Sequence, residues 1–152
     1  VYSEPGTGTI FNIYLPREKT DVTVVPETAA KTFCRGAETI LLVEDDEMLL
    51  KMETSMLEEN GYRVLAAATT DLAQSLTREH PGPIHLLISD MIMPVMNGRE
   101  LSVKLQPLRP EMKVLFLSGY TADIISLQGV IEEDIHFLQK PFSLEVFMSK
   151  VR

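Results

Sequence analysis

The most informative segment of the chain is residues 84–98, which read IHLLISDMIMPVMNG. Its first part, 84–89, is a short apolar run with the length and composition of a buried β-strand. The run ends at Asp90, and the residues that follow include Pro94 and Gly98, which favour a loop. The segment therefore predicts a strand that carries a carboxylate at its carboxyl end.

Two other apolar runs also end in charged residues. Residues 39–43 are followed by the acids Glu44 and Asp45, and residues 135–139 are followed by Lys140. The carboxyl ends of parallel strands open onto one crevice, so we expect these side chains to converge there with the carboxylate of the first run. Three acids and a lysine predict a divalent metal beside a nucleophilic carboxylate, which is a site that accepts a phosphoryl group.

From Thr39 onward, apolar runs alternate with amphipathic segments. Five such pairs predict an α/β fold, a doubly wound parallel sheet with helices on both faces. The runs at 40–43 and 114–117 are continuously apolar, as expected for strands buried on both faces. The predicted strands are 39–44, 62–67, 84–89, 113–117 and 135–139. The predicted helices are about 46–59, 70–79, 98–107, 121–132 and 142–151.

The first predicted helix shows clear start and stop signals. Asp46 and Glu47 are expected at its N-terminal end, where the helix dipole favours acids. Asn60-Gly61 supplies a C-terminal stop. Four apolar residues recur between these signals at helical spacing: Leu49, Met52, Met56 and Leu57.

Composition and charge narrow the possible functions. The chain has 152 residues, 45% hydrophobic and 24% charged, which is typical of a globular protein. A single cysteine, Cys34, cannot form an internal disulfide, so a reducing cytoplasm fits. Residues 38–152 hold 10 Lys+Arg and 18 Asp+Glu and so account for the whole net charge of −8. An acidic region without a basic stripe argues against nucleic acid as a partner. We also expect no direct membrane contact, because no apolar stretch approaches the roughly 18 residues of a membrane span.

The predicted site has a definite chemistry. Aspartate is a weak nucleophile toward phosphorus because the phosphoryl oxygens repel its charge, and a divalent metal offsets that repulsion. The three acids supply oxygen ligands, which select Mg²⁺ or Mn²⁺. Lys140 would neutralise a phosphoryl oxygen as a point charge. Ser118 and the amide of Gly119 follow another apolar run and would donate hydrogen bonds to the phosphoryl group.

The motifs at these strand ends, taken together, are specific to one protein family. Residues 38–152 resemble a receiver domain of two-component signalling. The motifs that carry the resemblance are Glu44-Asp45 after an apolar strand, Asp90 followed by Met93-Pro94 and Gly98, Ser118-Gly119, and Lys140-Pro141-Phe142. The resemblance implies a flavodoxin-like (βα)5 sheet with the strand order 2-1-3-4-5.

The resemblance also implies a role for each residue of the site. Asp90 corresponds to the phosphoacceptor. Asp45 corresponds to the direct metal ligand, Glu44 to the acid that acts through water, and the carbonyl of Ile92 to the backbone ligand. Lys140 and Pro141 correspond to a cis peptide.

The resemblance to receiver domains also implies a conformational switch. After phosphorylation, Ser118 would move toward the phosphoryl group and Phe137 would turn inward, which would alter the surface of the fourth helix, fifth strand and fifth helix. Ser and Phe stand where the family more often has Thr and Tyr. Ile92 and Tyr120 occupy the positions that flank the path of attacking water in the family, so the resemblance implies a relatively long-lived phosphoryl group.

The N-terminal residues suggest a longer parent protein. Residues 1–16 resemble the end of a histidine kinase ATP-binding domain, with a turn before a strand at 9–15. We expect that strand to be mobile, or to pair with another chain or with a sheet edge of its own domain. Residues 17–37 have the composition of a linker. With residues 38–152 as the receiver, this order and the start at Val1 imply a fragment of a hybrid sensor histidine kinase.

The predicted function is therefore a phosphoacceptor. The receiver would take a phosphoryl group onto Asp90, with Mg²⁺, from a histidine kinase or a histidine phosphotransfer domain, and switch its surface for signal relay. The fragment lacks a kinase catalytic core, so its own reactions would be self-phosphorylation and dephosphorylation. The alternative is a receiver-fold interaction module that works without phosphorylation. A phosphatase with an Asp nucleophile is disfavoured because Ile92 stands where its second Asp would lie. The oligomeric state, the sensed signal and the next partner stay open.

Overall fold

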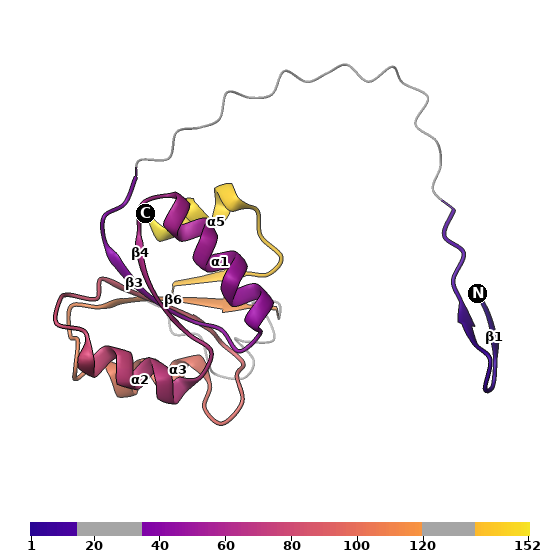
Figure 1. Cartoon of the computed structure of the whole chain (residues 1–152), viewed down its shortest axis with the longest axis horizontal. Helices are drawn as coiled ribbons and strands as arrows, with labels where there is room; N and C mark the ends of the chain where they lie inside the picture. The colour runs from indigo at the N-terminus through magenta and orange to yellow at the C-terminus, as the bar shows by residue number, and fades with distance from the viewer. Residues whose placement is uncertain (15–34, 120–135) are drawn as a thin grey trace, which may run out of the picture. The chain divides into compact units, whose positions relative to one another are not determined.

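The computed structural model describes residues 1–14, 35–119 and 136–152 of the chain (Figure 1). The chain divides into two units, Val1–Thr32 and Phe33–Arg152. In the residues that the structure describes, no helix is both long and apolar enough to cross a membrane.

The second unit is built on a five-stranded parallel sheet. Its strands are β3 (Thr39–Val43), β4 (Arg63–Ala67), β5 (Leu86–Asp90), β6 (Lys113–Ser118) and β7 (His136–Gln139). The strands lie in the order β4-β3-β5-β6-β7, which is 2-1-3-4-5 along the unit. The predicted doubly wound, flavodoxin-like fold is therefore confirmed. Every residue of β3 is buried, as its continuous apolar run predicts.

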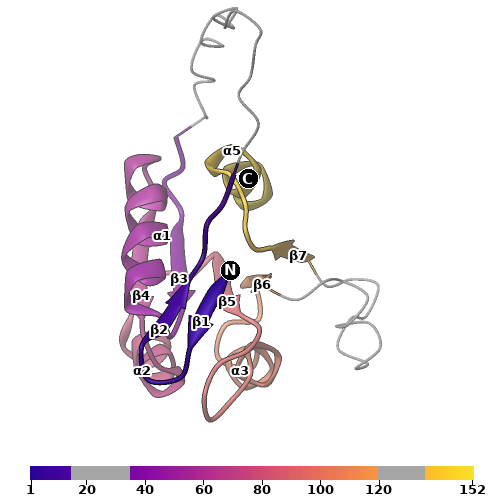
Figure 2. The same cartoon turned by 90° about the vertical axis from the view of Figure 1, so that its right-hand side faces the viewer.

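Helices cover both faces of this sheet (Figures 1 and 2). The described helices are α1 (Glu47–Glu59), α2 (Thr70–Glu79), α3 (Gly98–Leu105) and α5 (Leu144–Val151). Successive residues of β3 point to opposite faces, so Leu42 enters one core cluster with α1 and α5, and Leu41 enters another with α2 and α3. The predicted helix at 121–132 lies outside the described residues.

The ends of α1 follow the predicted signals. Asp46 is the N-cap, and its Oδ1 accepts hydrogen bonds from the amides of Met48 and Leu49 at 2.8 and 3.1 Å. The helix ends at Asn60, and Gly61 follows with a φ of 93°, a conformation that favours glycine. These contacts fix the direction in which α1 leaves the carboxyl edge of the sheet.

The inward face of α1 contains an acid. Leu57 is buried as the spacing predicts, but Met52 is 43% exposed and its neighbour Glu53 is 0% exposed. Residues 50, 53 and 57 share the inner face of the helix, and Met52 is rotated away from it by about 100°. Met52, one of the four apolar residues at helical spacing, therefore lies outside the buried face, and Glu53 lies in it.

The first unit contains a short β-hairpin. Strand β1 (Tyr2–Glu4) pairs antiparallel with β2 (Gly8–Ile10), and all the residues of both strands are exposed. The predicted strand at 9–15 therefore pairs within its own unit, which is one of the expected outcomes. It is also shorter than predicted, because residues 11–14 lie outside β2. The sequence analysis did not foresee β1, since three residues are too few to show a period.

Candidate functional site

Asp90 lies at the carboxyl end of β5, the central strand of the sheet. Its Oδ1 accepts a hydrogen bond from the amide of Ile92 at 3.3 Å. The loop that follows returns to the strand end at Gly98, where an added Cβ atom would lie 2.3 Å from the Asp90 carbonyl oxygen. Only glycine permits this approach, so Gly98 holds the loop and the start of α3 against the backbone of Asp90.

Glu44 and Asp45 lie beside Asp90 because β3 and β5 are adjacent and parallel. One carboxylate oxygen from each of the three acids lies within 4.8 Å of the others. Glu44 is buried, whereas Asp45 is exposed. The structure therefore brings together the three acids that the sequence predicts to converge.

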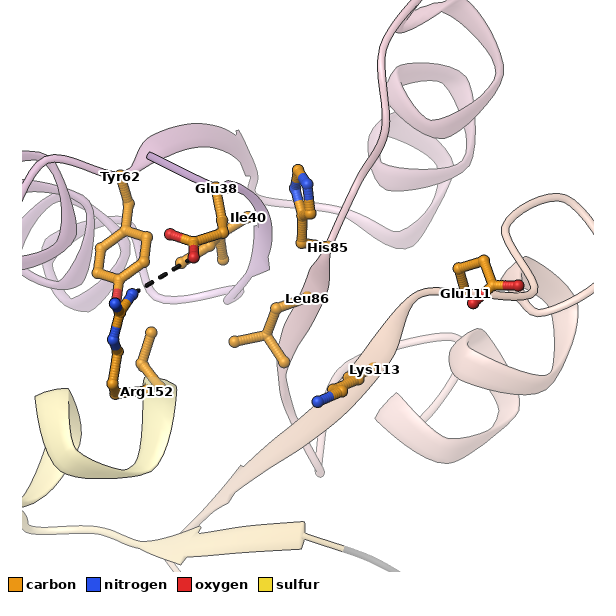
Figure 3. A pocket seen from close by; sticks show the side chains of 9 residues that line it. Glu38, Ile40, Tyr62, His85, Leu86, Glu111, Lys113 and Arg152 are labelled. Atoms are coloured by element: carbon orange, nitrogen blue, oxygen red, sulfur yellow. Dashed lines mark hydrogen bonds and ion pairs between the residues drawn. The ribbon is translucent and has the colours of Figure 1, made fainter. Parts of the chain in front are cut away.

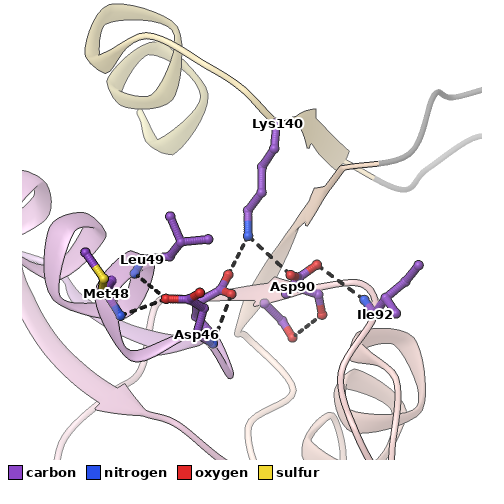
Figure 4. Close-up of polar contacts among 8 residues, drawn as sticks. Asp46, Met48, Leu49, Asp90, Ile92 and Lys140 are labelled. Carbon is purple, nitrogen blue, oxygen red and sulfur yellow. Dashed lines mark hydrogen bonds and ion pairs between the residues drawn. The ribbon is translucent and has the colours of Figure 1, made fainter. Parts of the chain in front are cut away.

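Lys140 reaches these acids from the end of β7 (Figure 4). Its Nζ donates to Glu44 Oε2 at 2.5 Å and to Asp90 Oδ2 at 3.2 Å. The side chains of Lys140 and Asp90 are each 17% exposed, and that of Glu44 is 2% exposed. The amide of Lys140 donates to the carbonyl of Ser118 at 2.7 Å, and the peptide bond between Lys140 and Pro141 is cis. Backbone contacts thus anchor the lysine whose ammonium group joins the two acids.

Burial and charge shift the pKa values of this group. Burial raises the pKa of Glu44, and the hydrogen bond from Lys140 opposes that rise only in part. Burial alone would lower the pKa of Lys140, but the hydrogen bond to Glu44 and the charges of Asp90, Glu44 and Glu53 raise it. Because a raised lysine pKa means a firmly held proton, Lys140 is a fixed positive charge beside Asp90.

One residue of this electrostatic network is absent from the sequence-based prediction. Glu53, in α1, is fully buried, and burial raises its pKa to about 7, with Lys140 lowering it and Glu44 and Asp90 raising it. No motif marks this residue. The only available signal is an acid three residues after Leu50 and four before Leu57, on the face of α1 that packs on the core.

Of the remaining predicted residues, Ser118 and Gly119 lie at the same edge of the sheet, and Phe137 lies within a strand. Ser118 is the last residue of β6 and is buried, and Gly119 follows it in an exposed position. Phe137 lies in β7, half-buried and paired with Phe116 of β6. Tyr120 lies outside the described residues. The described positions are consistent with the predicted order of functional groups along the strand ends.

The acidic cluster fits a hard divalent cation. Three carboxylates supply oxygen atoms close enough to share one ion, and oxygen ligands suit Mg²⁺ and Mn²⁺. The carbonyl of Ile92 is available from the same loop, because its own amide, and not its carbonyl, bonds to Asp90. The donor set that the sequence predicts is therefore chemically suited to the metal.

A separate cavity of about 280 Å³ lies at the opposite, amino edge of the sheet (Figure 3). Its lining includes Ile40, Tyr62, His85 and the ion pair of Glu38 with Arg152, whose atoms are 3.3 Å apart. None of the predicted site residues lines it. The cavity is therefore distinct from the acidic cluster at the carboxyl edge.

Comparison with known proteins gives the family. The model of the response regulator receiver domain matches residues 40–152. The chain belongs to this family. Accepting a phosphoryl group in two-component signalling is the general role of receiver domains, so the carboxyl edge of this receiver is the place to look for that activity.

Individual relatives agree with the family match. The chain is 34% identical over 158 residues to the sensor kinase CckA of Brucella abortus, an alignment that covers 99% of this chain and 17% of the kinase. It is 30% identical to the receiver protein CpdR of the same organism, over 74% of this chain and 92% of CpdR. The chain thus spans about a sixth of the sensor kinase but nearly all of the single-domain relative.

Solved structures show the same fold. The receiver domain of a hybrid histidine kinase CckA is 34% identical, covers 74% of this chain and 94% of that domain, and has a TM-score of 0.63. The receiver of HemR from Leptospira biflexa is 32% identical, covers 75% of this chain and 90% of that one, and also has a TM-score of 0.63. The receiver assignment therefore rests on sequence and structure together.

Proposed function

We propose that this receiver accepts a phosphoryl group on Asp90 from the histidine of a kinase or of a histidine phosphotransfer domain. The observation that carries the proposal is the environment of the Asp90 carboxylate. One of its oxygens bonds to Lys140 and the other to the Ile92 amide, and Glu44 and Asp45 lie within 4.8 Å. This combination of a nucleophile, a fixed cation and a cluster of oxygen ligands is what phosphoryl transfer to a carboxylate requires.

In the proposed reaction, an Asp90 oxygen attacks phosphorus. The new P–O bond forms as the P–N bond of the phosphohistidine breaks, and the leaving imidazole nitrogen takes a proton from solvent. Lys140 stabilises the negative charge on the phosphoryl oxygens as a point charge. The hydroxyl of Ser118 and the amide of Gly119 donate hydrogen bonds to the same group. Lys140 already bonds to Asp90 before the reaction, so this charge needs little reorganisation.

Glu44, Asp45, Asp90 and the carbonyl of Ile92 would hold Mg²⁺, with Mn²⁺ as a substitute. The ion, when bound, supplies positive charge that offsets the repulsion between the carboxylates and the phosphoryl oxygens. Because Glu44 is buried and Asp45 is exposed, we expect Asp45 to bind the metal directly and Glu44 to act through water.

Phosphorylation adds about −1.5 to −2 charges beside Lys140, if an acyl phosphate resembles other phosphoryl groups. We expect Ser118 to move toward that charge and Phe137 to turn from its half-buried position into the protein. The exposed side chain of Ile92 would hinder attacking water and lengthen the life of the phosphoryl group. The outcome would be a two-state surface for signal relay.

We infer that the parent protein is a hybrid sensor histidine kinase in the cytoplasm or anchored to a membrane. Residues 1–16 would end its ATP-binding domain, 17–37 would be a linker, and 38–152 the receiver. The alignment to CckA supports this order because it covers 99% of the chain and so extends beyond the receiver. The exposed hairpin at the start of the chain is also consistent with a piece of a larger domain.

The decisive experiment is an intact-mass measurement after incubation with Mg²⁺ and acetyl phosphate, a small phosphoryl donor. We expect the wild type to gain one phosphoryl group and Asp90→Asn to gain none. Asp45→Asn is the matched control for the metal, and we expect it to gain little at the same Mg²⁺ concentration. Equal gain in the wild type and Asp90→Asn would refute the assignment of the phosphoacceptor. No gain in a folded wild type, even with a purified kinase as donor, would favour an interaction module that works without phosphorylation.

A further inference from the structure

A buried carboxyl group lies beneath the site, in the middle of α1. Glu53 is 0% exposed, and neither of its carboxylate oxygens has a hydrogen-bond partner in the part of the chain that the structure describes. It shares a helix face with Leu50 and Leu57, which pack into the core. A buried polar group without a partner opposes folding, so packing alone does not explain an acid at this position.

The charges that act on Glu53 all come from the carboxyl edge of the sheet. Glu44 follows β3, Asp90 ends β5 and Lys140 follows β7, and among the described residues Lys140 is the only cation that acts on it. The other elements packed around α1 contribute apolar side chains to this core: Val64 from β4, and Phe147 and Met148 from α5. Within the described ranges, the charged groups that act on Glu53 are therefore those of the site.

Lys140 is the link between Glu53 and the reaction. Three acids act on this lysine, namely Glu44, Asp90 and Glu53. The first two bond to it directly and belong to the acidic cluster. Glu53 is the third, and it makes no bond of its own among the described residues. It is thus the one acid in this network that can change its charge without changing the cluster itself.

We propose that Glu53 is a positioning residue for Lys140, which weakens the hold of the lysine on Asp90 when it is ionised and leaves the lysine at Asp90 when it is protonated. The inference rests on the proposed function, because it concerns the same lysine and the same reaction. A negative charge in the core attracts the ammonium group strongly, since screening is weak there. A neutral carboxyl group does not compete with Asp90.

The expected consequence is a dependence on pH that one residue controls. As the pH rises from 6 to 8.5, the fraction of ionised Glu53 rises, Lys140 is drawn from Asp90, and phosphorylation of Asp90 slows. Glu53→Gln keeps the volume and removes the charge, so this variant lacks the effect. Any other source of pH dependence is common to both proteins, and the ratio of the two rates cancels its contribution.

The test is the rate of phosphorylation by acetyl phosphate at saturating Mg²⁺, measured as a ratio of wild type to Glu53→Gln. We expect this ratio to fall by about threefold to tenfold between pH 6 and 8.5, since one pKa unit corresponds to a factor of ten. Glu58→Gln changes an exposed acid of the same helix by the same charge, and we expect its ratio to stay constant. A constant ratio for Glu53→Gln, or an equal change in Glu58→Gln, would overturn the proposal.

A second measurement does not depend on phosphorylation. The Glu53 carboxyl carbon can be titrated by NMR in the wild type and in Lys140→Met. We expect the midpoint to lie near neutral pH and to move upward in Lys140→Met, because the lysine charge that favours ionisation is gone. An unmoved midpoint would exclude coupling between the two residues even if Asp90 is phosphorylated normally. A moved midpoint in a protein that accepts no phosphoryl group would instead reject the proposed function alone.

Discussion

The two edges of the parallel sheet each carry an ion pair, but the surroundings of the two pairs differ. At the carboxyl edge, Lys140 joins Glu44 and Asp90 with side chains that are 2–17% exposed. At the amino edge, Arg152 joins Glu38 at 3.3 Å with side chains that are 53% and 42% exposed. Both pairs are within ion-pair distance, so the main difference between them is how deeply their side chains are buried. Water screens the amino-edge pair, whereas the carboxyl-edge pair acts in a medium where charges interact strongly.

The largest expected effect on stability comes from removing the cation of the carboxyl-edge pair, and the amino-edge pair is the control. Lys140→Met leaves Glu44 buried without its cation, and we expect it to lower the free energy of unfolding at pH 7 by about 2–4 kcal/mol. Arg152→Met leaves an exposed acid that water solvates, and we expect a loss of less than about 1 kcal/mol. Urea unfolding of both variants measures the difference. Equal losses would contradict the view that burial distinguishes the two edges.

Glu53 is buried near the carboxyl-edge pair, and the effect of this burial on the free energy of unfolding depends on pH. Its pKa is raised from 4.5 to about 7, so the folded state binds its proton more tightly than the unfolded state does. The stability that this provides is fully present below about pH 4.5 and is lost as the pH rises toward 7. Glu53→Leu removes this loss, and we expect the variant to gain roughly 2 kcal/mol more over the wild type at pH 8 than at pH 5.

Thermal or urea unfolding at the two pH values measures that difference. Glu58→Leu is the control, because this acid is exposed on the same helix and should show no comparable dependence on pH. A gain for Glu53→Leu that is the same at both pH values would mean that the carboxyl group does not titrate in this range. The larger apolar side chain alone would then explain the gain.

The sequence predicts the carboxyl edge well and the supporting contacts poorly, for a physical reason. The ends of parallel strands lie together whatever the loops do, so Glu44, Asp90 and Lys140 can be placed from three apolar runs. The buried face of α1 cannot be predicted with the same precision. Met52 and Glu53 are neighbours, and only packing against the sheet decides which of them is buried. The pairing of β1 with β2 could not be predicted either, because a strand of three residues is too short to show a periodic pattern.

Arg109 gives the amino edge a partly buried cation of a different kind, and no sequence pattern predicts its role. It follows α3 in a loop before β6, and its guanidinium donates to the carbonyl of Thr77 twice, at 3.2 and 2.9 Å, to that of His80 at 2.6 Å and to that of Gly82 at 3.1 Å. No acid takes part in these bonds. They satisfy the carbonyl groups of Thr77 and His80 at the end of α2 and that of Gly82 in the loop that follows.

Arg109 is therefore expected to be structural, in contrast to Lys140. Arg109→Ala should lower the free energy of unfolding by about 2 kcal/mol, because several partly buried carbonyl groups lose their donor. Arg109→Lys should recover only part of that loss, since an ammonium group cannot reproduce the planar fork that spans three carbonyl groups. Both variants should still gain one phosphoryl group from acetyl phosphate at a nearly unchanged rate. A folded Arg109→Ala protein that fails to be phosphorylated would show instead that the two edges are coupled through the sheet.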